Sequence, residues 1–82
     1  NIVFMTKRYV SVLVLFDEIG NKTPKQIFLE DVCYEVNKVL EIKNAASLKV
    51  GGIGERFKVR INKTETFLFY EKEVERWFVE LK

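Results

Sequence analysis

The fold is decided by the stretch RFKVRINKTETFLFY, which spans residues 56–70. Its first six residues alternate between cationic and apolar side chains, and this period of two is typical of a β-strand. Asn62 and Lys63 then form a two-residue turn, because asparagine tolerates the left-handed backbone conformation that such turns need. The sequence therefore predicts a β-hairpin whose second strand covers residues 64–70.

A two-residue turn fixes the register of this hairpin. Ile61 pairs with Thr64, and counting back along both strands pairs Lys58 with Phe67 and Arg56 with Phe69. Paired residues share a face of the sheet, so one face collects the apolar side chains and belongs to the core. The other face interleaves cations with aromatic rings, and its residues are Arg56, Lys58, Arg60, Phe67 and Phe69.

Two further strands are predicted outside the hairpin. Residues 9–16 are mostly β-branched or aromatic and are apolar on both faces, which indicates a central strand. Residues 76–81 place Trp77, Val79 and Leu81 on one face. Between these elements, residues 44–54 hold three of the four glycines, and such clustering predicts an irregular loop.

Residues 24–40 fit two different structures. Apolar side chains recur there at helical spacing, and Thr23, Pro24 and Gln26 match a helix capping pattern. The β-branched content and a turn at Glu30 and Asp31 favour two strands instead. We therefore expect a mostly β domain with five or six antiparallel strands in a small curled sheet or barrel. The alternative is an α+β fold with a helix over residues 24–40.

Composition limits the classes of function. The 82 residues have a formal net charge of +2, with 48% apolar and 32% charged residues, which suits one small globular domain. The chain has no histidine and one cysteine, Cys33, which we expect to be buried or half-buried. Without histidine, the chain lacks the commonest general base and the commonest metal ligand. With a single cysteine, it cannot form an internal disulfide. We expect no enzyme activity, no catalytic or metal site and no cofactor.

The apolar runs, the single cysteine and the position of the first methionine indicate the compartment and the limits of the domain. No apolar run is long enough to span a bilayer, so we expect no membrane partner. An unpaired cysteine suits a reducing compartment, and we expect a cytoplasmic protein. Residues 1–4 precede the first methionine, Met5, and we expect them to be additions to a single small β domain over residues 5–82.

A family resemblance lies in the run AASLKVGGIGERF, residues 45–57, together with WFV at residues 77–79. With these motifs the chain resembles a family of small uncharacterised bacterial proteins, mostly from Gram-positive organisms. The resemblance covers residues 24–79 and implies a strand–turn–strand around Asp31, although Val32 stands where similar sequences often have glycine. It implies no established activity and no functional residue.

Charge is segregated along the chain. Residues 43–63 carry a net charge of +5, and the remainder carries −3. A hairpin that combines cations with aromatic rings is typical of a platform for single-stranded nucleic acid, because rings stack on bases and cations meet phosphates. Lys43 and Lys49 extend the predicted binding surface. A loop at Gly51, Gly52 and Gly54 is a second candidate, for an anion.

The predicted function is therefore that of a non-catalytic binding module for single-stranded nucleic acid. The alternative is a protein-interaction or structural accessory module, for which the basic surface indicates an acidic protein partner. Paired acidic residues in the turns, Ser47 beside Lys49, and Cys33 are better interpreted as solvated or structural groups than as sites. The sequence leaves the oligomeric state open.

Overall fold

The computed structural model describes residues 6–46 and 53–81, and every regular element within these ranges is a β-strand. The mostly β prediction is confirmed, and no helix forms over residues 24–40. The prediction of five or six strands was too low, because the described residues form seven. They are β1 (Thr6–Phe16), β2 (Lys22–Leu29), β3 (Val32–Glu35), β4 (Lys38–Ala46), β5 (Ile53–Ile61), β6 (Thr64–Glu71) and β7 (Arg76–Leu81).

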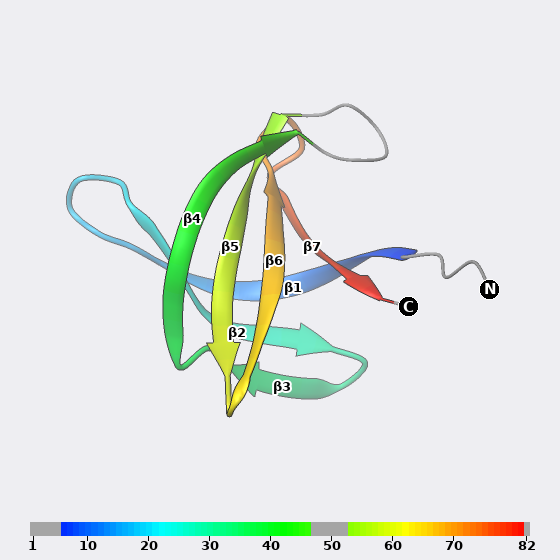
Figure 1. The fold of residues 1–82 in the computed structure, drawn as a ribbon. Coiled ribbons are helices and arrows are strands. Elements are labelled where there is room, and N and C mark those ends of the chain that lie inside the picture. The colour runs from blue at the N-terminus through cyan, green and yellow to red at the C-terminus, as the bar shows by residue number, and fades with distance from the viewer. Residues whose placement is uncertain (1–5, 47–52, 82) are drawn as a thin grey trace.

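The seven strands form one antiparallel sheet in the order β3-β2-β1-β7-β6-β5-β4. Strand β1 is long enough to pair with β7 along its first half and with β2 along its second half. In Figure 1, β4, β5 and β6 run upright while β1, β2 and β3 cross behind them. The sheet thus curls into a half-barrel, and its two ends face each other.

The link between β3 and β4 holds the two ends of the sheet together. The Val36 N–H donates to the Lys25 carbonyl at 2.9 Å, and the Asn37 N–H donates to the Arg60 carbonyl at 2.8 Å. The Asn37 side-chain oxygen accepts a further bond, at 2.6 Å, from the backbone N–H of Asn62 in the β5–β6 turn. These three bonds satisfy backbone groups that a free link would leave to water.

The core fills the concave side of the half-barrel. Phe57, Val59 and Leu68 are fully buried, and the Trp77 ring packs against Phe57 with 5.1 Å between ring centroids. Ile27 on β2 reaches the same cluster from the opposite layer. Burial of one large apolar side chain contributes about 1.5–3 kcal/mol, so this cluster is the main stabilising element of the domain.

The helical spacing in residues 24–40 was misleading because the turn between β2 and β3 lies within it. Glu30 and Asp31 have φ values of 50° and 64°, so both adopt the left-handed conformation of a tight hairpin turn. Pro24 is buried beside a register shift in the β1–β2 ladder, where a missing N–H is tolerated. The expectation for Cys33 was wrong, since its side chain is exposed on β3.

Both ends of the region predicted as an irregular loop, residues 44–54, belong to strands. Strand β4 continues to Ala46, and β5 begins at Ile53. Gly54 is therefore buried inside β5, paired with Ala45 and with Glu71, rather than in a loop. The other residues of the predicted anion loop, Gly51 and Gly52 with Lys49 at the rim, lie outside the described residues.

Candidate nucleic-acid interface

The β5–β6 hairpin has the register that the sequence predicts. Its pairs run from Ile61 with Thr64 to Arg56 with Phe69 without a shift. Asn62 begins the turn with a φ of 57°, as expected of asparagine in this position. The surface that combines cations with aromatic rings is therefore present on the convex side of the sheet, which we call the outer face.

A row of paired residues crosses the outer face from β4 to β1. Lys43 pairs with Arg56, Arg56 with Phe69, Phe69 with Phe78, and Phe78 with Tyr9. The Phe69 and Phe78 rings are stacked, with centroids 4.9 Å apart and planes 7° apart. Tyr9 meets Phe78 edge to face at 6.1 Å. The three rings form a continuous aromatic row with cations at its β4 end. Phe78 in its centre is buried, at 5% exposure, whereas Tyr9 is 45% exposed and Phe69 is half-buried.

Phe67 lies next to this row. It is more accessible than Phe69, the other ring that the sequence places on this face. Its side chain is 40% exposed, whereas Phe69 is only partly exposed. The Arg56 guanidinium lies over the Phe67 ring, 4.5 Å from its centroid. A guanidinium in this position leaves its own outer surface available for a further planar group.

The cations nearest the β5–β6 turn are paired with a carboxylate. Glu65 lies 3.3 Å from Arg60 and 3.5 Å from Lys58. The hydrogen bond from Arg60, with the added charge of Lys58, holds the pKa of the Glu65 carboxyl below its usual value. These groups are exposed, so the pairs add little to stability and can exchange partners easily.

A second charged cluster borders the far end of the aromatic row. The Lys7 ammonium lies over the Phe78 ring at 4.6 Å and pairs with Glu71, which also accepts a 2.7 Å hydrogen bond from the Tyr9 hydroxyl. The hydrogen bond from Lys7 lowers the pKa of the Glu71 carboxyl. Partial burial opposes the charged form of Lys7, but its bonds to Glu71 and Tyr9 raise its pKa overall.

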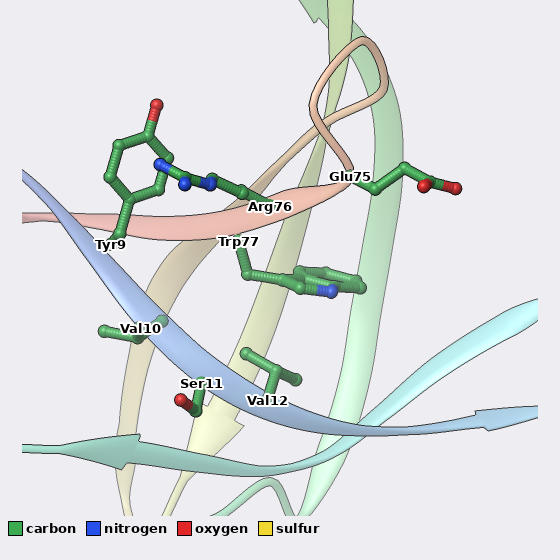
Figure 2. A pocket seen from close by; sticks show the side chains of 7 residues that line it. All are labelled: Tyr9, Val10, Ser11, Val12, Glu75, Arg76 and Trp77. Carbon is green, nitrogen blue, oxygen red and sulfur yellow. The ribbon is translucent and has the colours of Figure 1, made fainter.

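Arg76 completes the cluster from β7. Its guanidinium lies 5.0 Å from the centroid of the Tyr9 ring, and Figure 2 shows the two side chains on one side of the sheet, with Trp77 on the other. The hollow that these residues border, together with Ser11 and Glu75, measures about 460 Å³. The remaining residues that line this hollow are Val10 and Val12, which pack against the core.

Sequence reasoning found half of this surface. It identified the residues of β5 and β6 but missed four residues of β1 and β7, namely Lys7, Tyr9, Arg76 and Phe78. Alternation within residues 76–81 already placed Phe78 opposite the core residues Trp77 and Val79. What the sequence did not indicate is that β7 lies between β6 and β1, which brings the rings together.

The outer face combines aromatic rings with charged side chains. Rings supply flat surfaces for stacking, and the cations of the outer face outnumber its carboxylates. Within the described ranges no group of acidic, histidine or cysteine side chains could hold a metal ion, and no helix could span a membrane. By strand register, the charged residues of this face include Lys7, Lys38, Lys43, Arg56, Lys58, Arg60 and Arg76 against Glu35, Glu41, Glu65, Glu71 and Glu80.

Comparison of the chain with protein-family models, with curated proteins and with solved structures finds no match. The functional argument therefore depends on the geometry of the outer face.

Proposed function

We propose that the outer face binds single-stranded nucleic acid, with unpaired bases stacked beside Phe67 and phosphates near the surrounding cations. The observation that supports this most directly is the accessible Phe67 ring beneath the Arg56 guanidinium. A base can stack on the guanidinium plane or replace it on the ring, and both contacts are common in single-strand binding. Neither contact requires a particular base, so little sequence preference is expected.

The nucleic-acid strand would follow the row of paired residues that crosses the outer face. Tyr9 and Phe69 offer ring surface there, and the buried Phe78 packs against both. Arg56, Phe69, Phe78 and Tyr9 lie on four adjacent strands, which are spaced about 4.8 Å apart in a β-sheet. Cations border the row on both sides, so a phosphate backbone can run alongside stacked bases. A duplex hides the faces of its bases, and this geometry therefore favours single strands over duplexes.

The carboxylates of the outer face set the expected affinity. Because Glu65 already neutralises Lys58 and Arg60 in part, a phosphate must compete with it for these two cations. The affinity should therefore be moderate and strongly dependent on salt. We also propose that the module is non-catalytic and acts in the bacterial cytoplasm, which the family resemblance and the single cysteine support.

The test is a salt titration of binding to short labelled oligonucleotides, followed by fluorescence anisotropy. Single-stranded DNA and RNA of about ten nucleotides and a duplex of equal length are compared between about 25 and 400 mM salt. Three phosphate contacts would give a log–log slope of about −2, at about −0.7 for each contact. Absence of binding at low salt, or equal affinity for the duplex, would contradict the proposal.

A second candidate, a protein-interaction module, is favoured by a different part of the outer face. Leu13 and Leu15 on β1 and Phe28 on β2 are 55%, 53% and 42% exposed. Exposed apolar side chains in one region often mark a protein contact. Binding to an acidic polypeptide such as polyglutamate, with no binding to single strands, would support this function instead.

A further inference from the structure

The sheet has two unpaired edges, and they differ in length and charge. Strand β3 (Val32–Glu35) ends the sheet on one side, and β4 (Lys38–Ala46) ends it on the other. No strand among the described residues pairs with the outer edge of β4. An exposed edge of this kind presents backbone donors and acceptors to another strand, and native proteins usually protect it with charges.

The charges on β4 are arranged symmetrically around one residue. Glu41 and Lys43 lie on the outer face, 44% and 58% exposed, with 3.6 Å between their charged atoms. Ile42 lies between them, points to the opposite face and is 50% exposed. A carboxylate and an ammonium thus flank an apolar residue at equal spacing along the edge.

We propose that β4 pairs with β4 of a second copy of this chain, antiparallel and about a twofold axis at Ile42. In this register Ile42 lies beside its own counterpart, and Glu41 of each copy lies opposite Lys43 of the other. Leu40 lies opposite Asn44 in the same way. Two cross-strand ion pairs and one apolar pair form together, so the edge is complementary to itself.

The edge at β3 offers no such match. Its four residues include one charged side chain, Glu35, so self-pairing of β3 forms no ion pair. If β4 carried only cations, its edge would repel a second copy. Glu41 supplies a carboxylate, so the two edges attract each other instead. The choice of a second copy as the partner follows from this charge complementarity, and it is independent of the proposed function.

Pairing at β4 would join the two sheets into one, with the outer faces of both copies side by side. The paired segment, residues 40–44, is short because β4 has a register shift between Val39 and Glu41. Its interface would be smaller than the roughly 1,200 Å² of a stable complex. We therefore expect a reversible dimer with a Kd of about 10 µM to 1 mM.

The test is sedimentation equilibrium of the wild-type chain and of Glu41→Lys and Lys43→Glu, without nucleic acid. Each variant places two pairs of like charges across the axis, so association should fall by about tenfold or more. An equimolar mixture of the two variants restores both ion pairs and should form a heterodimer. The double variant, with the two charges exchanged, should form a homodimer again.

Matched controls are Glu73→Lys and Lys72→Glu, which make the same charge changes in the exposed β6–β7 turn. They should associate like the wild type. The proposal is overturned if the wild type stays monomeric to about 1 mM, if the single variants at β4 associate as the wild type does, or if their mixture associates no better than each variant alone. Circular dichroism confirms that each variant is folded.

Discussion

Replacing Phe67 with alanine tests whether this ring binds nucleic acid or only stabilises the fold. A fully buried phenylalanine contributes about 1.5–3 kcal/mol, and Phe67 is 40% exposed, so about half of this applies. Loss of the exposed contact with Arg56 adds about 0.5–1 kcal/mol. The expected loss of unfolding free energy is about 1.3–2.5 kcal/mol, and a domain of this size, with a total of about 4–12 kcal/mol, should remain folded.

The same substitution should weaken binding to a single-stranded oligonucleotide by about 5- to 150-fold, from the loss of about 1–3 kcal/mol of stacking. The slope of affinity against salt should change little, because no charge is removed. Fluorescence anisotropy measures the affinity, and urea unfolding measures the stability of the same variant.

Phe28→Ala is the matched control for this experiment. Phe28 is also on the outer face and is 42% exposed, but it lies on β2, away from the cation-rich strands. Its replacement should lower stability by a similar amount and leave oligonucleotide affinity unchanged. The reasoning is refuted if Phe67→Ala binds like the wild type, if it unfolds the domain, or if both substitutions weaken binding equally.

Three further predictions concern charge and backbone conformation. Glu65→Gln should raise oligonucleotide affinity and steepen the salt slope by up to about 0.7 for each released cation, whereas unchanged binding would mean that these cations do not meet phosphate. Asp31→Gly should raise the unfolding free energy in urea by about 0.4–1 kcal/mol, because glycine adopts the φ of 64° without strain, and a loss of stability would indicate a different turn. Glu71 has a lowered pKa in the folded state, so it contributes stability above pH 4.5 that is lost as the pH falls through the folded value. The difference in stability between the wild type and Glu71→Gln should disappear in that acidic range, and a constant difference down to pH 2 would contradict this.

The β5–β6 hairpin could be predicted in full because its information is local. Alternation of charge and apolarity in residues 56–61 sets the faces, and Asn62 sets the turn, so the register follows by counting. The β2–β3 hairpin was harder to recognise, since Glu30 and Asp31 adopt positive φ values without glycine or asparagine. Its apolar residues also happen to match a helical period.

The remaining part of the candidate site depends on pairing between distant strands. Tyr9 and Phe78 are 69 positions apart in the sequence and become neighbours only when β1 pairs with β7. Each strand alone shows which residues share a face, but alternation does not reveal the neighbouring strand. The same limit applies to Lys7 and Glu71, whose ion pair bridges β1 and β6 across β7.

The most direct test of the central claim is a nuclear Overhauser measurement on the protein in complex with a short pyrimidine oligonucleotide. We expect intermolecular contacts between base protons and the ring protons of Phe67, with further contacts at Phe69 or Tyr9, which are also accessible. Contacts confined to the concave side of the sheet, or a bound complex with no base-to-ring contact on the outer face, would contradict the claim that this face is a stacking platform.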